Sequence, residues 1–440
     1  MAKKIEVATI KIWGKKVGAV SWNDDKRVSQ FQYDPSFLKS GIELSPIHIP
    51  LEDGEDIFTF RTLKYDTYKG LPGLLSDCLP DDFGNKIIDA WLAQEGRSKE
   101  DFSPIERLCY TGKRGMGALE FEPIAVKADT KSGPIQISTL VEVANDILND
   151  RESFETKLGK DEKEKKQALK EIIRVGTSAG GARPKAVIAV NDDTGEIRSG
   201  QAEAPEGFEH WLLKFDGVSG DGLGDPEGYG RVEYAYYLMA KDLGIEMTEC
   251  RLHEENGRAH FMTKRFDREN GKKHHIQSLC AISHYDYKSP GAYSYEQTFQ
   301  VIRKLKMSHE YTEQLFKRMA LNIIGRNQDD HTKNISFILK QGQEWALSPA
   351  YDITHSYKPG SEWVSRHQMT MNGKEDHFTE EDFKKIAESV EVNNWKEIMK
   401  ETIEVVKNWS SYAKKTDVKI NQMETIRDSH RVDYDFSKNK

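Results

Sequence analysis

The sequence predicts an α+β protein in which a half rich in strands precedes a mostly helical half. Up to residue 265, short alternating or wholly apolar runs bounded by turn residues dominate, and these are typical of strands. After residue 266, apolar residues recur at helical spacing in one stretch after another. We find no internal repeat and no long low-complexity tract, so neither half is a copy of the other.

Composition limits the class of protein. The chain has 440 residues, enough for roughly two to three domains. Hydrophobic residues make up 37%, aromatic residues 10% and charged residues 31%, which excludes a disordered chain and indicates a globular one. The net charge of −8 argues against a protein whose main task is to coat nucleic acid. The four cysteines have neither disulfide-framework nor metal-ligand spacing.

The start of the chain bears on where the protein works. Its first residues, MAKKIEVATIKIW, alternate between polar and apolar types like a strand and lack the apolar core of a signal peptide. No window approaches the roughly 18 apolar residues that a membrane-spanning helix requires. We therefore expect a cytoplasmic protein that makes no membrane contact.

The predicted elements of the first half follow from local patterns. We expect strands at 5–12, 16–22, 31–33, 186–190, 210–215, 248–252 and 258–264, and helices at 83–94 and 231–243. An Asn-Gly pair at Asn256 predicts that the last two strands form a hairpin. The polar stretch 124–137 is a plausible boundary. The charge run 155–171 fits a solvated helix, with an electrostatic docking surface as the alternative.

The second half is predicted to be helical. Amphipathic periodicity places helices at 295–306, 310–326, 379–391, 394–408 and 417–432. Between the second and third of these helices lie a polar loop and an apolar strand, and this segment contains the most informative residues of the chain.

The loop that follows residue 326 carries chemical groups at a telling spacing. Asp329 and Asn334 are five residues apart, as are the catalytic aspartate and metal-binding asparagine of a kinase loop. A carboxylate must accept or orient the proton of the attacking hydroxyl, while an amide oxygen nearby holds a metal against the phosphates. The spacing alone is weak evidence in so acidic a chain, and a solvated loop is the alternative.

A second acid strengthens the interpretation. Asp352 follows the strand-like stretch after the loop, in the order in which a kinase places its metal-binding aspartate. Loop, strand and second aspartate in this order are more specific than the spacing alone.

Two segments could surround phosphates. The first, residues 220–225, carries acids that would repel phosphate and is better explained as an ordinary loop. The second, residues 175–185, offers glycines, backbone N–H groups and two cations, and it leads directly into a strand. It is not a Walker A motif, because no Gly-Lys-Ser/Thr opens a helix. It therefore fits a kinase-type flap.

Lys214, at the end of an apolar run, is the candidate strand lysine, and Glu233 is its candidate partner.

Together these segments resemble the HipA family of serine/threonine kinase toxins. The similar segments are LPDDFG at 79–84, GKRGMGAL at 112–119, GGARPK at 180–185, RFDR at 265–268, DDHTKN at 329–334 and YDI at 351–353. The resemblance implies a bilobal protein-kinase-like fold with an N-terminal α/β region. It further implies three domains: 1–125 as the N-terminal HipA-type region, 126–265 as the kinase N-lobe and 266–440 as the helical C-lobe.

The resemblance also implies roles for individual residues. Asp329 would be the catalytic base, Asn334 and Asp352 would bind Mg²⁺, and Ser178, or the adjacent Thr177, would be autophosphorylated. A phosphate there would add roughly −1.5 to −2 charge to a phosphate-binding loop and silence the enzyme. ATP would be contacted by Gly180, Gly181, Ala182, Arg183, Pro184, Lys185, Lys214, Lys264, Arg265, Phe266, His331, Lys333, Asn334, Tyr351 and Asp352.

Two positions depart from the family pattern. Asp330 stands where some relatives have glycine and places a second acid beside the expected base, although the spacing to Asn334 favours Asp329. Lys264 replaces an acid of some relatives, a change that backbone contacts to adenine would survive.

The expected function is therefore an ATP- and Mg²⁺-dependent serine/threonine protein kinase, the toxin of a toxin–antitoxin pair. The resemblance implies an aminoacyl-tRNA synthetase as substrate, a partner with a helix-turn-helix, and DNA contact only through that partner. A small-molecule kinase of the same fold and a pseudokinase that acts as a co-repressor scaffold are the alternatives.

Overall fold

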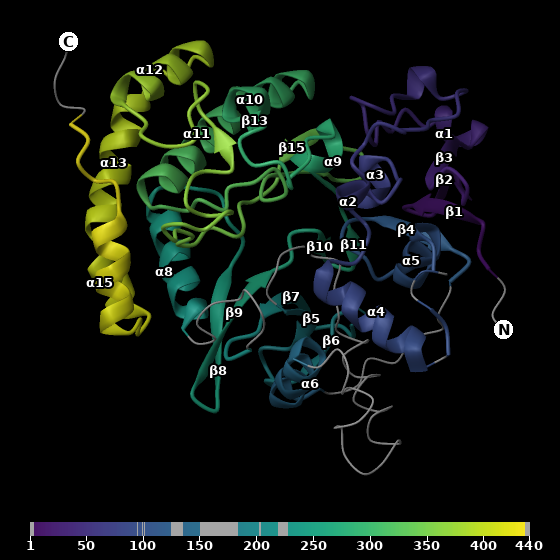
Figure 1. The fold of residues 1–440 in the computed structure, drawn as a ribbon, viewed down its shortest axis with the longest axis horizontal. Coiled ribbons are helices and arrows are strands. Elements are labelled where there is room, and N and C mark those ends of the chain that lie inside the picture. Colours follow the sequence, from purple (N-terminus) through teal and green to yellow (C-terminus); the bar gives the residue numbers. More distant parts are fainter. Residues whose placement is uncertain are drawn as a thin grey trace. The chain divides into compact units, whose positions relative to one another are not determined.

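The computed structural model describes residues 4–94, 96–98, 100, 102–124, 135–149, 184–201, 204–218 and 228–435. The chain forms two compact units, and many of their helices and strands are labelled in Figure 1. The first comprises Met1–Gly230 and Arg251–Ile276, and the second comprises Arg231–Cys250 and Gln277–Lys440. The chain therefore enters the second unit, returns to the first and leaves it again. The division into three consecutive domains stays a prediction.

The first unit begins with a four-stranded antiparallel sheet in the order β3-β2-β1-β4. Its strands are β1 (Val7–Ile12), β2 (Lys15–Asn23), β3 (Val28–Tyr33) and β4 (Leu119–Glu122). Alternate residues such as Ile10, Ile12 and Phe31 are buried, because successive side chains of a strand point to opposite faces. The strands predicted at 5–12, 16–22 and 31–33 are confirmed.

The first unit also contains helices before its second sheet begins. They are α1 (Pro35–Leu38), η1 (Leu51–Asp53), α2 (Tyr65–Tyr68), α3 (Gly73–Ser76), α4 (Asp82–Gln94), α5 (Pro104–Thr111) and α6 (Ile137–Asn149). Helix α5 begins with a capping box, in which Ser103 and Glu106 each bond the other's backbone N–H group. The predicted helix 83–94 is confirmed as α4.

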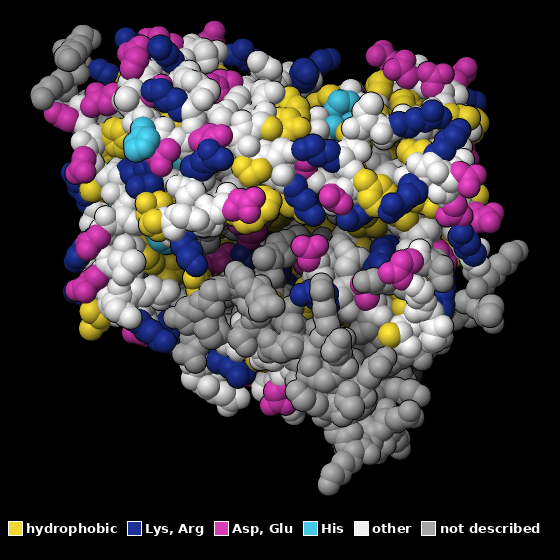
Figure 2. All heavy atoms as spheres, in the orientation of Figure 1, with side chains coloured by type: hydrophobic (Ala, Val, Ile, Leu, Met, Phe, Trp, Pro, Cys, Tyr) yellow, Lys and Arg dark blue, Asp and Glu magenta, His cyan; other side chains and the backbone are white. Residues whose placement is uncertain are grey.

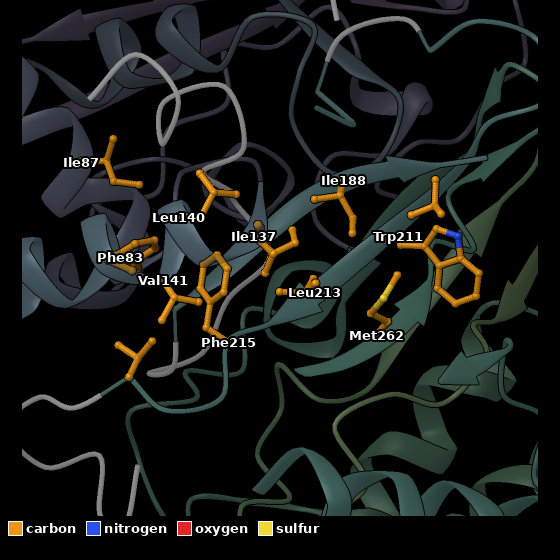
Figure 3. Packing of buried hydrophobic residues seen from close by; sticks show 14 residues of the cluster. Phe83, Ile87, Ile137, Leu140, Val141, Ile188, Trp211, Leu213, Phe215 and Met262 are labelled. Atoms are coloured by element: carbon orange, nitrogen blue, oxygen red, sulfur yellow. The ribbon is translucent and has the colours of Figure 1, made fainter. Parts of the chain in front are cut away.

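The second sheet of this unit has five strands in the order β6-β5-β7-β9-β8. They are β5 (Lys185–Val190), β6 (Ile197–Ser199), β7 (Glu209–Lys214), β8 (Cys250–Glu255) and β9 (Arg258–Lys264). Helices α4 and α6 cover one face of it, where Phe83, Leu140 and Val141 meet Ile188 and Leu213 (Figure 3). This apolar layer fixes β5 and β7, which carry two of the residues predicted to bind phosphate.

A buried acid anchors the end of β9. Asp267 is fully buried and accepts hydrogen bonds from Arg265 Nη2 (2.6 Å), Arg268 Nη1 (2.7 Å) and the Gly117 amide (2.8 Å). Burial alone would raise the pKa of Asp267, but the two arginines outweigh it and hold that pKa well below its usual range. The short hairpin of β10 (Arg268–Glu269) and β11 (Lys272–Lys273) follows.

The second unit is mostly helical. Its helices are α8 (Tyr229–Asp242, from its third residue), α9 (Leu279–Ser283), α10 (Tyr295–Lys304), α11 (His309–Ile324), α12 (Glu380–Ser389), α13 (Trp395–Lys407), α14 (Trp409–Lys415) and α15 (Ile420–Ser429). Its short strands are β12 (His275–Ser278, from its third residue), β13 (Tyr293–Ser294), β14 (Ser336–Leu339), β15 (Trp345–Leu347) and β16 (Met369–Thr370). Helix α11 packs against α10 and α13 and is almost wholly buried over its last three turns.

The end of the chain differs from the sequence prediction in two ways. The helix predicted at 394–408 is confirmed as α13, and a separate helix, α14, begins at Trp409, with Asn408 as the cap between the two. The helix predicted at 417–432 ends at Ser429, and His430 is extended. The N–H group of Arg431 then bonds the Ile324 carbonyl instead of continuing the helix, a long-range contact that local periodicity does not reveal.

The surface matches a charge-rich composition. Lysine and arginine side chains are interspersed with aspartate and glutamate over the face shown in Figure 2. Within the described ranges, no helix is long and apolar enough to cross a membrane.

Candidate active site

The loop predicted to carry the chemistry lies between α11 and β14. Its two key residues are held together, because Asn334 Nδ2 donates to the Asp329 carbonyl oxygen at 2.7 Å. The Asn334 amide also donates to the His331 carbonyl at 2.8 Å, which closes the turn between them. The Asp329 side chain is 47% exposed, so a substrate hydroxyl can reach this carboxylate.

Asp330, the neighbouring acid, differs from Asp329 in its burial and in its hydrogen-bond partners. Asp330 is buried and accepts hydrogen bonds from Tyr295 OH (2.7 Å), His367 Nδ1 (2.8 Å) and the Gln368 amide (2.8 Å). Burial alone would raise the pKa of Asp330, but His367 and these donors outweigh it, so the pKa lies below its ordinary value. The Asp330 carboxylate is therefore occupied by protein donors, whereas Asp329 faces solvent.

Asp352 lies close to this loop. It follows β15, and its backbone adopts the left-handed conformation with φ 54°. Asn327 Nδ2 approaches the Asp352 carbonyl at 3.3 Å. Asn334 and Asp352 line one small cavity of about 20 Å³, room for about one water molecule. The structure thus brings together the two residues that the sequence nominated as metal ligands.

Tyr351 ties the two segments together. Its hydroxyl donates to the Lys333 carbonyl at 2.6 Å and also contacts the Ser336 hydroxyl. Because Tyr351 precedes Asp352 and Lys333 precedes Asn334, these bonds set the spacing between the two candidate ligands. The resemblance implies a nucleotide contact for Tyr351. Its role in holding the two segments together depends on a long-range contact, which the sequence alone does not show.

His331 and Lys333 flank the same loop. His331 Nε2 lies 3.8 Å from Asp329 Oδ1, and its ring packs edge-on against Tyr287 with centroids 5.4 Å apart. Lys333 Nζ lies 4.9 Å from the centroid of the same Tyr287 ring. Tyr287 therefore orients both residues, a role that no motif in the sequence signals.

Other predicted site residues lie in the first unit. Lys185 and Lys214 are directly opposite each other in the antiparallel pair of β5 and β7. Like charges directly opposite each other in a sheet are destabilising. The two lysines nevertheless lie at the same point of the sheet, where they concentrate positive charge. The Pro184 carbonyl accepts a hydrogen bond from the Phe215 amide at 3.1 Å. Ser178, with Thr177, Gly180, Gly181, Ala182 and Arg183, lies outside the described residues.

The segment predicted to contact adenine is strongly bonded already. Lys264 Nζ pairs with Glu209, and the Arg265 guanidinium binds Asp267. The Arg265 amide donates to the His210 carbonyl at 2.9 Å, which extends the ladder between β7 and β9. Phe266 follows directly. The Arg265 amide is thus engaged within the sheet and is not the group that an adenine would use.

The described ranges contain no group of three or more His, Cys, Asp or Glu side chains that could hold a metal ion. Asn334 and Asp352 offer one amide and one carboxylate, a sparse set of oxygen donors. Mg²⁺ is commonly held by one or two carboxylates and completes its six ligands with water and substrate phosphates. The donor set fits a cation that arrives with a phosphate ligand.

Two family models match the chain. The HipA N-terminal domain matches residues 8–122, and the HipA-like C-terminal domain matches residues 177–409, more than half of the chain. The chain belongs to the HipA family. The resemblance drawn from the sequence is therefore confirmed, and both halves of the HipA-family chain are matched.

A solved HipA structure agrees with the family on the fold. HipA of Shewanella oneidensis MR-1, determined with HipB and its operator DNA, is similar with a TM-score of 0.63 and 17% identity. The similarity covers 96% of this chain and 100% of that one, so the mixed α/β fold is that of a HipA protein. The Helicobacter pylori proinflammatory kinase CtkA gives a TM-score of 0.33 and 13% identity over 51% of this chain and 88% of that one. The search of curated proteins gave no match.

Proposed function

We propose that this HipA-family chain is an ATP-dependent serine/threonine protein kinase with a bilobal, protein-kinase-like fold. The proposal rests on one observation above all: exposed Asp329 is hydrogen-bonded through its backbone to Asn334, which shares a cavity with Asp352. Phosphoryl transfer requires a base, an amide and a second acid in this arrangement, because positioning and charge neutralisation supply most of the catalysis.

In this mechanism Asp329 accepts the proton of the acceptor hydroxyl. The hydroxyl oxygen forms a bond to the γ-phosphorus, the bond between that phosphorus and the β–γ bridging oxygen breaks, and ADP leaves. His331, near Asp329 Oδ1, borders the same carboxylate. Asp330 is unsuited to the role because donors from Tyr295, His367 and Gln368 already occupy its oxygens.

ATP and Mg²⁺ suit the groups that the chain offers. When bound, ATP would supply the phosphoryl group, and Mg²⁺ would neutralise part of the negative charge on the phosphates. Asn334 and Asp352 hold the metal in the proposal, and the positive charge of Lys185 and Lys214 favours phosphate. Gly180, Gly181, Ala182, Arg183 and Pro184 cover the phosphates. Lys264, Arg265 and Phe266 contact the adenine, with His331, Lys333 and Tyr351 completing the nucleotide contacts.

The biological role is the toxin half of a toxin–antitoxin pair. The Shewanella relative was determined with HipB and operator DNA, which supports an antitoxin partner for this chain. We assign that partner a helix-turn-helix and the only DNA contact. The acceptor is a serine or threonine of a translation-related protein such as an aminoacyl-tRNA synthetase, and phosphorylation of Ser178 silences the kinase. A cytoplasmic location and the domains 1–125, 126–265 and 266–440 complete the proposal.

The proposal is tested with pure protein, γ-labelled ATP and Mg²⁺, alongside the Asp329→Asn variant. We expect label on Ser178 or Thr177, mapped by mass spectrometry, and none in the variant. ATP binding should be nearly the same in both proteins, because Asp329 acts on the acceptor. Equal labelling of wild type and variant would refute the assignment of Asp329.

Two alternatives have distinct signatures in a cell lysate. A small-molecule kinase would label metabolites and no protein, whereas a scaffold would bind its partner and transfer no phosphoryl group. The presence of Asp329, Asn334, Asp352 and Lys214 favours a kinase over the scaffold, because a pseudokinase usually lacks at least one such group.

A further inference from the structure

The chain turns back onto the candidate active site at the end of α15. We define the C-terminal segment as Ser429, His430 and Arg431. Helix α15 ends at Ser429, His430 is extended, and the segment runs along the end of α11. All of its contacts described below lie within the second unit.

The segment first completes the end of helix α11. The final carbonyls of any α-helix have no partners within the helix, and here the Arg431 amide donates to the Ile324 carbonyl at 2.9 Å. The buried Tyr236 hydroxyl contacts both the Gly325 carbonyl and His430 Nε2, the latter at 2.9 Å. The turn that leads into the catalytic loop is therefore fixed by residues far away in the sequence.

A compact charged group continues this contact into the loop itself. Arg326, in the left-handed conformation with φ 58°, donates from Nε to the Ser429 carbonyl at 2.8 Å. Asp376 pairs with Arg431 and lies 3.8 Å from Arg326 Nη1. Two guanidinium groups thus share one carboxylate. Burial, followed by the charge of Arg326, lowers the pKa of Arg431.

Gln328 connects this group directly to the candidate base. Its side chain is fully buried. The orientation of this side-chain amide is assigned from its partners. In the orientation that satisfies both ends, the nitrogen donates to the Val364 carbonyl at 3.1 Å and the oxygen accepts from Arg326 Nη1 and Arg431 Nη2, each at 3.2 Å. Because Gln328 immediately precedes Asp329, Arg431 reaches the residue next to the exposed carboxylate.

The same segment also holds the part of the chain that carries the second acid. His355 Nε2 lies 2.9 Å from the Ser429 hydroxyl, and His355 is three residues after Asp352. The backbone provides a further link, because the Gln328 amide donates to the Ser356 carbonyl at 3.0 Å. The C-terminal segment therefore contacts both the loop that carries Asp329 and the segment that carries Asp352, and these two acids act together in the proposed function.

We propose that Arg431 is a positioning residue for phosphoryl transfer, acting through Gln328 and Asp376 to hold the loop that carries Asp329. This inference rests on the proposed function and deepens it. Arginine is required because its planar fork can donate to the Gln328 oxygen and the Asp376 carboxylate at once, whereas lysine offers a point charge on a flexible stem. A loop displaced by about 1 Å can lose about 100-fold in rate.

The test compares Arg431→Lys with the matched variant Arg427→Lys. Arg427 lies in the last turn of α15, and its half-exposed side chain pairs only with neighbouring Asp428 among the contacts that the structure describes. We expect Arg431→Lys to lower kcat by about 100-fold while KM for ATP stays within about twofold. Arg427→Lys should leave both unchanged. Asp376→Asn removes the shared acid from the other side and should lower kcat by at least about tenfold.

A second measurement does not depend on activity. Amide hydrogen exchange of residues 327–334 should be faster in Arg431→Lys than in wild type and unchanged in Arg427→Lys, at equal midpoints of urea unfolding. A purely structural role would lower the midpoint and leave turnover per folded molecule intact. Wild-type kcat in Arg431→Lys overturns the inference. If the wild-type chain transfers no phosphoryl group, the proposed function fails, and unchanged exchange in Arg431→Lys independently overturns the positioning role.

Discussion

Asp330 Oδ2 lies 2.8 Å from His367 Nδ1, and these side chains are 1% and 0% exposed. The pair joins the loop that carries Asp329 to the segment that follows Asp352, with Tyr295 of α10 as a further donor. The two consecutive acids of the loop therefore have different roles in our proposal. Asp330 fixes the backbone, and Asp329 remains exposed for chemistry.

This separation predicts opposite phenotypes for two neighbouring substitutions. Asp330→Asn places an amide donor among donors in a buried site and should reduce the free energy of unfolding by about 3 kcal/mol. Asp329→Asn should change that free energy by less than about 0.5 kcal/mol, because the side chain is half exposed, yet abolish phosphoryl transfer. Urea unfolding and a labelled-ATP assay measure the two quantities, and the reverse pattern would exchange the two roles.

Asp352 should control the response to metal. We expect Asp352→Asn to raise the Mg²⁺ concentration needed for half-maximal transfer by at least tenfold, because a carboxylate is replaced by a neutral amide. Calorimetry in the presence and absence of Mg²⁺ should show that the metal no longer strengthens ATP binding in the variant. An unchanged Mg²⁺ titration would remove Asp352 from the metal site.

His430 predicts a loss of stability in acid. Burial, with His355 and Arg326 nearby, lowers the pKa of His430 to about 3. The unfolded chain, with an ordinary histidine pKa of about 6.5, therefore binds more protons, so this contribution is present above pH ~6.5 and is lost as the pH falls towards 3. Between pH 7 and 5 the loss should be about 2 kcal/mol.

The variant His430→Gln isolates that contribution. It should reduce the loss of unfolding free energy between pH 7 and 5 by about 2 kcal/mol, measured by urea unfolding at closely spaced pH values. Identical slopes for the wild type and the variant would show that His430 does not account for the acid sensitivity.

The buried Asp267 cluster should be essential for the first unit. Asp267→Asn leaves Arg265 and Arg268 without their shared carboxylate and should cost about 3–5 kcal/mol of unfolding free energy. Asp192→Asn is the control, because Asp192 pairs with Arg251 at the surface and is 56% exposed, and it should change stability by less than about 1 kcal/mol. Comparable losses in both variants would contradict the buried-cluster assignment.

The sequence predicted most of the local structure because periodicity and turn residues determine it. The hairpin at Asn256, the strands β5 and β7 and the long helix α11 all follow from neighbouring residues. The predicted helix 394–408 matches α13, whereas the separate helix α14 that directly follows it was not predicted. The end of α15 was missed because its last residues turn aside to bond Ile324 and Gln328.

The candidate site was partly predictable for a similar reason. Asp329, Asn334 and Asp352 lie on consecutive segments, so their spacing in the sequence indicates proximity in space. The burial of Asp330, in contrast, depends on His367 and Tyr295. The involvement of Arg431 depends on Asp376, which lies in a loop without a recognisable motif. Such contacts between distant segments are determined by tertiary packing and leave no local signal.

The contact between Arg431 and Gln328 has a consequence for how the protein is made. A ribosome produces roughly 5–20 residues per second, and the loop around Asp329 emerges well before Arg431 does. For several seconds each nascent chain carries its candidate base without the brace supplied by Ser429, His430 and Arg431. Until the end of α15 has been translated, the nascent chain lacks the contact that we propose positions Asp329, so its phosphoryl transfer should be slow.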